Sequence, residues 1–575
     1  MQNKKKFKDI ILSGNEALAR GAYEAGVNVA AGYPGTPSSE ILEYIKRFDE
    51  VDAQWSVNEK VAFEVAYGAS IGGARSLYVS KHVGINVAMD PLMVSAYTGI
   101  SAGFVIVTCD DPGVHSSQNE QDNRRIASFA KMPLIEPSSP FEAKELIKKA
   151  FDISEKYQTP VLFRMTTRIC HSKENIILSK RIEKQKPPFD IPMKQYVMVP
   201  ANSYPRHLYL EKRILRIKTF SEKTKLNFIE NGKGITGFIT SGVSYLYIKE
   251  NYPDAPILKL GMSYPFPEKL ALKFAKQVKN IIVVEELEPF IEEQMKMLAI
   301  KHKAKDPSYR VGELKSEFIP KIIQGQKKKE KKRTGKKPLF CAGCPHRPVF
   351  YVLKQLKVTV AGDIGCYALA AMPPLSSLHT CLCMGAGISA FEGIRRGRKE
   401  QPLVGVLGDS TFVHSGITGL INAAYNKQTG VIIILDNSTT AMTGCQPNPS
   451  TGITLKGEKT KKLSLEKIAE VSGADEVIVV DPFKIKELKK HITESLSNKK
   501  LTVIITRSPC KFIDKTTKGH VDYNIDKCKK CQVCLQIDCP AISKTAEGFI
   551  DIDSELCSGC GLCVEVCSFK ALTKK

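Results

Sequence analysis

The sequence predicts a multidomain α/β chain that ends in a small cysteine-rich module. Three observations support this prediction. The chain has 575 residues, which is too many for a single hydrophobic core. Short apolar runs alternate with amphipathic stretches over most of its length, which is typical of parallel strands joined by crossover helices. Eight of the 17 cysteines lie in two nearly identical runs near the C-terminus.

A first α/β unit is expected at residues 1–185. The predicted buried strands are Val27–Ala31, Leu77–Val79, Phe104–Thr108 and Val161–Arg164. The predicted helices are Ser38–Arg47, Glu59–Gly72 and Pro140–Lys156. Prolines in Lys186–Met193 then interrupt the pattern, so a domain boundary is expected there.

Two further α/β units are expected, at residues 200–305 and 338–510. The strands predicted for the first of them are Gly234–Ser241, Ile257–Leu260 and Asn280–Glu285. The strands predicted for the second are Lys357–Ala361, Leu403–Leu407, Val431–Leu435, Glu476–Val480 and Thr502–Thr506. A basic linker is expected between them at 306–337, and the cysteine-rich module, of α+β type, at 519–575.

The positive charge is concentrated in the expected linker. The formal net charge is +24, and the stretch from Lys301 to Lys337 holds 14 Lys and Arg against four Asp and Glu, so it supplies 14 − 4 = +10. Such a run is more often a solvated segment than a nucleic-acid site, and no nucleic-acid partner is expected. The alternative is a docking surface that steers an acidic electron carrier.

The sequence also bears on location. No run of about 18 apolar residues is present, and no membrane span is expected. The N-terminus is charged but lacks the apolar stretch of a secretion signal. Seventeen cysteines, eight of them suited to clusters, call for a reducing compartment. We therefore expect a cytoplasmic protein.

The cysteine-rich module has the ligands expected for two [4Fe–4S] clusters. Each run has three cysteines at two-residue spacing and a fourth further on, which typically serves the cluster of the other run. Zinc ligands usually come as separated pairs, and disulfide frameworks belong to secreted chains, so both alternatives are less favoured. The expected ligands are Cys528, Cys531, Cys534 and Cys567 for cluster 1, and Cys557, Cys560, Cys563 and Cys539 for cluster 2.

Two predicted strands of the third unit end in side chains suited to a divalent cation. One leads into Gly408, Asp409 and Ser410, and the next leads into Asn437, 28 residues after Asp409. A single crossover helix, Val413–Tyr425, would put both strand ends on one edge of a parallel sheet. Oxygen ligands completed by phosphate suit Mg²⁺, so the expected ligands are Asp409, Asn437 and Thr439. The alternative is an ordinary turn between buried strands.

The run from Gly408 to Asn437 resembles the metal and diphosphate motif of thiamin diphosphate enzymes, with Ser410 where that motif usually has Gly. Three other runs are similar to the diphosphate-binding domain of 2-oxoacid:ferredoxin oxidoreductases: Pro338–Arg347, Gly362–Tyr367 and Thr443–Pro449. The resemblance implies transketolase-like, doubly wound domains and a thiamin diphosphate site. The cofactor-binding residues that it implies are Gly408, Asp409, Ser410, Asn437, Thr439 and Cys366.

Cys341 and Cys344 form a further pair in this unit. Cys381 and Cys383 lie downstream, but no second pair stands at a convincing spacing for a metal site. We therefore expect Cys341 and Cys344 to line the cofactor site rather than to hold a third metal centre.

In thiamin diphosphate enzymes a second α/β domain holds the aminopyrimidine beside an acid. The stretch Glu59–Ser70 resembles the helix that carries this acid, which implies a catalytic role for Glu59, with Glu64 as the fallback. Acids also occur at helix starts simply because of the helix dipole. The loop Gly32–Glu40 resembles the family loop that reaches the substrate carboxylate, which implies a catalytic role for Thr36.

The residue that anchors the substrate carboxylate is not assigned by the resemblance. The family has an Arg in a later loop, and here the comparable stretch is Cys109–Gly113. Lys81 and His82, which follow a predicted strand, are candidates for this role.

The order of the domains resembles the larger subunit of family members that act on aryl 2-oxoacids, and the likeness covers nearly the whole chain. It implies oxidative decarboxylation of indolepyruvate and related arylpyruvates to acyl-CoA, with two [4Fe–4S] clusters passing electrons to ferredoxin. The cofactors are then thiamin diphosphate and Mg²⁺, with coenzyme A as co-substrate. A separate smaller β subunit is implied, so the assembly would be a hetero-oligomer.

Two alternatives within thiamin chemistry stay open, namely a 2-oxoacid:ferredoxin oxidoreductase of other specificity and a non-oxidative lyase with an accessory ferredoxin module. A third alternative is an electron-transfer subunit without thiamin chemistry.

Overall fold

The computed structural model describes residues 9–185, 190–329, 338–398, 400–514, 516 and 519–574. Two compact units make up the chain, an N-terminal unit at 1–332 and a C-terminal unit at 333–575. Most of the expected proline break, residues 186–189, lies outside the described residues. Each unit is described by itself.

The N-terminal unit is built on a seven-stranded sheet with the order β12-β6-β7-β5-β4-β2-β3. All neighbours from β6 to β3 run parallel, as the apolar runs predicted. The strands are β2 (Val29–Gly32), β3 (Asp52–Trp55), β4 (Ser76–Lys81), β5 (Phe104–Asp110), β6 (Leu134–Ile135), β7 (Val161–Thr166) and β12 (Met262–Tyr264). The edge strand β12 belongs to the expected second α/β unit, so the two domains share one sheet.

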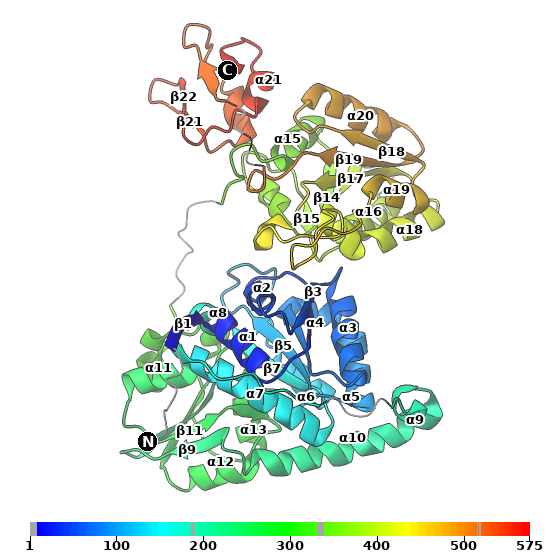
Figure 1. Cartoon of the computed structure of the whole chain (residues 1–575). Coiled ribbons are helices and arrows are strands. Elements are labelled where there is room, and N and C mark those ends of the chain that lie inside the picture. The colour runs from blue at the N-terminus through cyan, green and yellow to red at the C-terminus, as the bar shows by residue number, and fades with distance from the viewer. Residues whose placement is uncertain are drawn as a thin grey trace, which may run out of the picture. The chain divides into compact units, whose positions relative to one another are not determined.

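Helices cover both faces of this sheet. On one face α1 (Gly14–Glu24) packs along α7 (Pro140–Tyr157), and α7 contacts β5 and β7 (Figure 1). On the other face α3 (Glu59–Ile71) and α5 (Met89–Thr98) cover β2, β4 and β5. The remaining helices are α2 (Ser39–Ile45), α4 (His82–Val87), α6 (Arg124–Ala130) and α8 (Thr167–His171). Strands β1 (Asp9–Ser13) and β8 (Lys173–Ile177) form a separate antiparallel pair.

The middle domain has a four-stranded sheet with the order β13-β10-β11-β9. Its strands are β9 (Asn227–Glu230), β10 (Thr236–Ser241), β11 (Ile257–Leu260) and β13 (Asn280–Val284), and only β9 runs antiparallel. Its helices are α9 (Met193–Tyr196), α10 (Pro200–Ser221), α11 (Ser244–Asn251), α12 (Glu268–Ala275) and α13 (Phe290–Met297).

The expected basic linker, 306–337, is folded over much of its length. The elements η1 (Pro307–Arg310), η2 (Ser316–Phe318) and α14 (Ile319–Gln324) follow the middle domain. Tyr309, Leu314, Ile319 and Ile322 join the apolar core beside β10 and β13. Apolar positions between the lysines therefore attach this segment to the domain, and a solvated linker can begin only after α14. Residues 330–337 lie outside the described residues.

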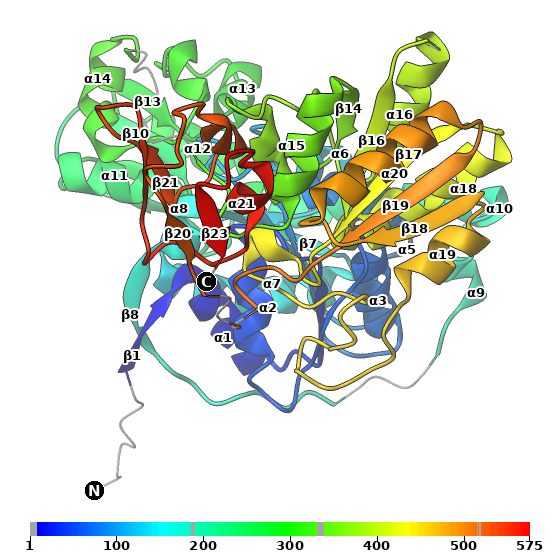
Figure 2. The ribbon, with the colours of Figure 1, turned by 90° about the horizontal axis from the view of Figure 1, so that it is seen from above.

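The C-terminal unit contains a six-stranded, fully parallel sheet with the order β15-β14-β16-β17-β19-β18. Its strands are β14 (Thr359–Gly362), β15 (Thr380–Cys381), β16 (Leu403–Gly408), β17 (Gly430–Asp436), β18 (Glu476–Val480) and β19 (Leu501–Arg507). Helices α15 (His346–Leu356) and α20 (Ile485–Ser497) share one face of it. Helices α16 (Ala386–Gly397), α18 (Ile417–Tyr425) and α19 (Leu465–Val471) cover the other face, and Figure 2 shows α20 lying over the sheet beside β19.

The cysteine-rich module consists of two short antiparallel strand pairs and two helical turns. The pairs are β20 (Val521–Tyr523) with β23 (Leu572–Lys574), and β21 (Ile542–Lys544) with β22 (Ile550–Ile552). The turns are η6 (Val533–Ile537) and α21 (Leu562–Val566). The module shares an apolar core with α15, and Arg347 Nη1 donates to the Ile537 carbonyl at 2.9 Å. It therefore docks on the parallel-sheet domain of its own unit.

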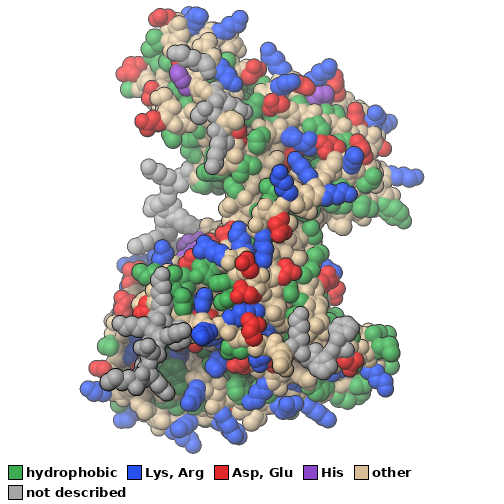
Figure 3. All heavy atoms as spheres, viewed as in Figure 1, with side chains coloured by type: hydrophobic (Ala, Val, Ile, Leu, Met, Phe, Trp, Pro, Cys, Tyr) green, Lys and Arg blue, Asp and Glu red, His purple; other side chains and the backbone are tan. Residues whose placement is uncertain are grey.

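The surface carries mixed charge. On the face shown in Figure 3, Lys and Arg side chains are interspersed with Asp and Glu over the N-terminal unit. Among the described residues, no helix combines the length and the apolar character needed to span a bilayer.

Candidate active site and iron–sulfur sites

In the C-terminal unit the predicted metal ligands lie at the carboxyl ends of neighbouring strands. Strands β16 and β17 are paired, with Gly408 opposite Leu435, so Asp409 and Asn437 leave the sheet at the same edge. Both are buried. The Thr440 hydroxyl donates to Ser410 Oγ at 3.0 Å, which joins the two loops. The crossover predicted from the spacing is present, although it starts with α17 (Asp409–Thr411) and a π-helical turn, Phe412–Gly416, before α18.

Asn437 is oriented by a residue from another element. Its amide Nδ2 lies 3.3 Å from Nε2 of His346, the first residue of α15. Burial lowers the pKa of His346 to about 4, so the imidazole is neutral and can accept this hydrogen bond. The contact turns Oδ1 of Asn437 away from the ring and makes it available to a cation.

The surroundings of Asp409 disfavour its ionised carboxylate, and a bound divalent cation would stabilise that form. Burial, and then the nearby Asp436 carboxylate, raise the pKa of Asp409 to about 7. The Ser410 N–H donates to Asp409 Oδ1 at 2.8 Å, and the Ser450 hydroxyl donates to Oδ2 at 3.4 Å. A bound cation reverses this penalty because it stabilises the ionised carboxylate. The oxygen donors present therefore fit Mg²⁺ held together with a diphosphate.

The motif residues that follow β14 meet the same strand end. The Tyr367 hydroxyl donates to the Ile364 carbonyl at 2.7 Å and accepts from the Gly408 N–H at 3.0 Å. Asp363 Oδ2 accepts from the N–H of Gly387 at 2.7 Å, near the start of α16. Burial raises the pKa of Asp363 to about 6. Asp363 directly follows β14 and is a second acid at this edge; it lies within the run Gly362–Tyr367, but no role was predicted for it.

In the N-terminal unit, Glu59 begins α3 and is buried, while Glu64 is exposed on the same helix and pairs with Lys60. The N-cap Asn58 accepts from the Val61 N–H at 2.9 Å, which fixes the start of the helix. Glu59 packs against Gly84 so closely that a Cβ on that glycine would lie 2.8 Å from Oε1. The fold thus distinguishes the two acids of α3 by burial, which sequence alone did not.

Thr36 lies in the loop after β2, where three segments meet. The Ser116 hydroxyl donates to the Thr36 carbonyl at 3.2 Å, and the Lys81 ammonium donates to the Ser116 carbonyl at 2.6 Å. The loops after β2 and β5 are thereby joined to the end of β4. All three positions are on the carboxyl edge of the parallel strands, where ligands of such sheets bind.

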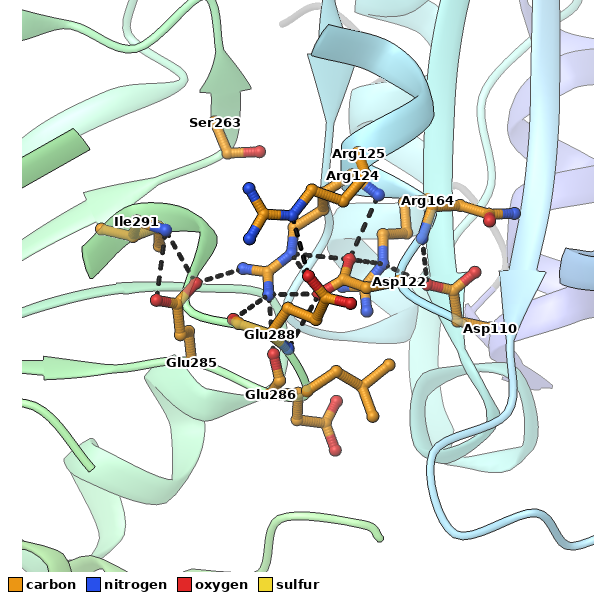
Figure 4. A network of polar contacts seen from close by, with 12 residues as sticks. Asp110, Asp122, Arg124, Arg125, Arg164, Ser263, Glu285, Glu286, Glu288 and Ile291 are labelled. Carbon is orange, nitrogen blue, oxygen red and sulfur yellow. Dashed lines mark hydrogen bonds and ion pairs between the residues drawn. The ribbon is translucent and has the colours of Figure 1, made fainter. Parts of the chain in front are cut away.

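A buried network of ion pairs lies beside this edge and joins the two domains of the N-terminal unit (Figure 4). Arg124 contacts Asp122 and, at 2.6 Å, Glu285 of the middle domain. Arg164 contacts Asp110 at 2.6 Å and Glu136 at 2.8 Å. The guanidinium of Arg124 is thus hydrogen-bonded at every nitrogen, whereas Arg164 is paired with carboxylates through Nε and Nη1 and its buried Nη2 has no hydrogen-bond partner among the described residues.

The eight cysteines of the C-terminal module separate into two groups of four. Cys528, Cys531, Cys534 and Cys567 line one cavity, whereas Cys539, Cys557, Cys560 and Cys563 line a second cavity. Burial and the neighbouring thiols raise the pKa of Cys534 to about 11 and that of Cys563 to about 12. These are the two sets predicted from the spacing, each with its fourth cysteine from the other run.

Within the described ranges, no three His, Cys, Asp or Glu side chains are grouped tightly enough to hold a single metal ion. This arrangement is compatible with cluster ligands, because each cysteine of a [4Fe–4S] site binds a different iron atom. The thiol donors and the cavity between them fit a cluster in both groups.

A further thiol group was missed by the sequence analysis. Cys341, Cys344, Cys366, Cys445 and Cys510 lie near one another, and burial, followed by the neighbouring thiols, raises the pKa of each of them for which a shift is resolved. The partners come from three loops at unrelated spacings, so no motif could reveal them. Cys344 also lines the cavity of the second cysteine group, so the two sites adjoin.

Comparison with known proteins agrees with these sites. Residues 20–235 match the thiamin diphosphate-binding domain of pyruvate flavodoxin/ferredoxin oxidoreductases. Residues 363–506 match the C-terminal domain that binds thiamin pyrophosphate in thiamin pyrophosphate enzymes, and residues 550–573 match a 4Fe–4S binding domain. Fold and sites together define a thiamin diphosphate- and iron–sulfur-dependent oxidoreductase that acts on 2-oxoacids.

Sequence relatives indicate which family within this class of oxidoreductases the chain belongs to. Indolepyruvate oxidoreductase subunit IorA of Archaeoglobus fulgidus is 38% identical over 541 residues, which cover 88% of this chain and 87% of the relative. IorA of Pyrococcus horikoshii is 38% identical over 554 residues, with 87% and 85% covered. IorA of Methanothermobacter thermautotrophicus is 36% identical over 559 residues, with 90% and 89% covered. The chain belongs to the family of indolepyruvate oxidoreductase subunit IorA.

Proposed function

We propose that this chain is the larger subunit of an enzyme that oxidatively decarboxylates arylpyruvates, such as indolepyruvate, to acyl-CoA and reduces ferredoxin. One observation supports the redox part most strongly. The strand-end site of Asp409 and Asn437 belongs to the same compact unit as two four-cysteine cavities. A non-oxidative decarboxylase has no use for such cavities. The aryl specificity rests on the family, because the relatives are named for indolepyruvate.

The reaction balances as a two-electron oxidation. A 2-oxoacid anion and coenzyme A react with two oxidised one-electron carriers to give acyl-CoA, CO₂, two reduced carriers and one proton. The bond between the carboxylate and the oxo carbon breaks, and a bond from that carbon to sulfur forms. Iron–sulfur clusters transfer one electron at a time, so this chemistry calls for a chain of them.

Thiamin diphosphate, when bound, supplies the carbon centre that adds to the oxo group and accepts the electron pair left by CO₂. In the C-terminal unit, Asp409, Asn437 and Thr439 would hold Mg²⁺ with the diphosphate. The cofactor-binding roles of Gly408, Ser410 and Cys366 remain predictions, supported for Gly408 by its hydrogen bond to Tyr367. Glu59 would hold the proton at the aminopyrimidine, and its burial at the start of α3 supports that role.

The position of the cysteine groups supports an order for electron transfer. The cavity of Cys539, Cys557, Cys560 and Cys563 is also lined by Cys344 and Arg347 of the parallel-sheet domain. The cavity of Cys528, Cys531, Cys534 and Cys567 is lined by residues of the module alone. We infer that cluster 2 receives electrons first and that cluster 1 passes them to ferredoxin.

The assembly would be a hetero-oligomer with a separate, smaller β subunit. The relatives are all named as subunits, which supports an enzyme of more than one chain. Coenzyme A is the acyl acceptor in this proposal.

A substrate panel tests the proposal. The complete complex is assayed anaerobically with coenzyme A and a low-potential dye, using indolepyruvate, phenylpyruvate, pyruvate and 2-oxoglutarate. We expect the highest kcat/KM for an arylpyruvate. Faster oxidation of pyruvate or 2-oxoglutarate would replace the substrate assignment, and no dye reduction with any acid would reject the oxidative reaction.

A further inference from the structure

Lys81 occupies the position in the N-terminal unit where a ligand is most readily bound. Strand β2 pairs with β3 on one side and with β4 on the other, so the chain connections diverge between β2 and β4. Ligands of open parallel sheets bind outside the carboxyl ends at such a switch point. Lys81 is the last residue of β4, and Thr36 lies in the loop after β2.

The side chain of Lys81 is held in place along its length. Its stem lies against the loop after β2, so that a Cβ on Gly35 would be 3.0 Å from the Lys81 Cβ. At its end, Nζ donates to the Ser116 carbonyl at 2.6 Å. An ammonium has three N–H donors. Among the described residues Ser116 is its one hydrogen-bond partner and no carboxylate forms an ion pair with it, so two donors remain for a ligand.

The surroundings of Lys81 favour an anionic ligand. Loss of hydration lowers the pKa of Lys81 to about 8, and Asp111 is the charged group that opposes this effect. Asp111 does not compete for the ammonium, because its own oxygens accept from the Ser116 N–H at 2.9 Å, the Ser117 hydroxyl at 2.6 Å and the Thr167 hydroxyl at 2.9 Å. An anion placed at Nζ would therefore stabilise a cation that the protein itself leaves without an ion pair.

The other cations near this edge are already engaged. Arg124 and Arg164 are buried and paired with carboxylates, as Figure 4 shows. His82 is fully buried, and its Nε2 lies 3.1 Å from Asn119 Oδ1, so it holds the loop after β5 and does not reach a ligand. Arg168, beyond β7, pairs with Glu313 at 2.7 Å.

We propose that Lys81 binds the carboxylate of the 2-oxoacid substrate, with the Thr36 hydroxyl beside it, in place of the arginine used elsewhere in the family. The proposal rests on the proposed function and assigns the anchor that the sequence leaves open. Thr36 is tied to the same Ser116 that Lys81 contacts, and its hydroxyl has no hydrogen-bond partner among the described residues. An ammonium binds as a point charge, so one carboxylate oxygen would face it.

The competing explanation is that Lys81 only fixes the loop after β5 through Ser116. The two roles are separated by comparing substrates with and without a carboxylate. We compare Lys81→Met with Lys81→Arg and with the control Lys60→Met, since Lys60 is an exposed residue of α3 that pairs with Glu64. Each complex is assayed with phenylpyruvate and with phenylacetaldehyde, as substrate or, where turnover is slow, as competitive inhibitor.

We expect Lys81→Met to raise KM for phenylpyruvate roughly 10- to 100-fold, the effect of losing a charge-assisted hydrogen bond, with a smaller change in kcat. Phenylacetaldehyde should bind as in the wild type, Lys81→Arg should recover much of the loss, and Lys60→Met should change neither constant. An unchanged KM in Lys81→Met, or equal weakening of acid and aldehyde, would overturn the proposal.

Two further measurements test the role of Lys81 if the variant does not fold or if the complex oxidises no arylpyruvate. If Lys81→Met does not fold, the wild type is measured alone: KM for phenylpyruvate should rise as pH passes about 8, and a constant KM between about pH 7 and about pH 9 would overturn the proposal. If the wild type oxidises no arylpyruvate, the substrate assignment fails, and Lys81 is then tested with whichever 2-oxoacid the panel identifies.

Discussion

Nη1 of Arg124 lies 2.6 Å from Oε2 of Glu285, and this buried ion pair links the two α/β domains of the N-terminal unit. The same guanidinium contacts Asp122 of its own domain. Removing one partner of such a pair leaves an uncompensated buried charge, which costs more than the pair itself contributes. The network is therefore expected to fix the position of the middle domain against the carboxyl edge where Thr36 and Lys81 lie.

Arg124→Ala is expected to destabilise the N-terminal unit by about 3–5 kcal/mol, because Glu285 and Asp122 would stay buried without their cation. Arg125→Ala is the matched control. Its side chain is partly exposed and pairs with Glu288 and Glu293 at the surface, where such pairs contribute about 1 kcal/mol or less. Chemical denaturation of the full chain measures both, and equal losses would contradict the role of burial.

Glu286 provides a pH test of stability. Burial raises its pKa to about 7, above the ordinary value of 4.5, so the folded state binds a proton that the unfolded state releases. Its contribution to stability is present below pH 4.5 and is lost as pH rises through about 7. Glu286→Gln should therefore flatten the fall in stability between pH 5 and pH 8 by up to about 3 kcal/mol. Parallel pH profiles of wild type and variant would reject this assignment.

Asp409→Ala is expected to weaken Mg²⁺-dependent binding of thiamin diphosphate at least about 100-fold, since losing even an outer partner of a metal ligand costs 10- to 100-fold. Asp481→Ala is the control, because Asp481 also directly follows a strand of the same sheet but is exposed beside the edge strand β18. Calorimetric titration gives both affinities. Undiminished binding in Asp409→Ala would remove Asp409 from the metal site.

Glu59→Gln is expected to slow exchange of the C2 proton of bound thiamin diphosphate roughly 10²- to 10⁴-fold, the usual contribution of general acid–base catalysis. Exchange into deuterated solvent, followed by NMR after an acid quench, measures this without substrate. Glu64→Gln, on the exposed side of the same helix, should exchange at the wild-type rate. The reverse pattern would make Glu64 the acid.

Paired cysteine variants test which ligands share a cluster. Cys531→Ser should remove about four iron atoms per chain, and adding Cys567→Ser should remove no more, because both residues line one cavity. Cys560→Ser combined with Cys567→Ser should remove about eight, since Cys560 lines the other cavity. Cys383→Ser, at an exposed thiol outside both groups, should keep all iron. Additive loss in the Cys531 and Cys567 pair would contradict the crossed arrangement.

Strands dominated by apolar residues could be located from the sequence. Ile257–Leu260 and Glu476–Val480 have the predicted bounds as β11 and β18. Two strands were not predicted: β3, Asp52–Trp55, because its residues have mixed polarity, and β6, Leu134–Ile135, because it has only two residues. Periodicity cannot detect either kind, since the sheet around them decides their conformation.

The site residues that could not be predicted from the sequence were missed for a similar reason. The spacing predicted correctly that Asp409 and Asn437 lie at one edge of the sheet, because a single crossover fixes where consecutive parallel strands end. It could not indicate that Cys510 approaches Cys341, or that His346 orients Asn437, because those pairs are separated by more than 90 residues. The sequence also placed Ile319 in a linker, although its apolar neighbours bury it in the middle domain.

We propose above that one complex couples decarboxylation of the 2-oxoacid to reduction of ferredoxin. Stoichiometry tests it most directly: indolepyruvate and coenzyme A are mixed anaerobically with the complete complex and excess ferredoxin, and CO₂, acyl-CoA and reduced ferredoxin are counted. We expect one CO₂ and one acyl-CoA for about two reduced ferredoxins, if each ferredoxin accepts one electron. Release of CO₂ with free indoleacetaldehyde and no reduced ferredoxin would contradict it.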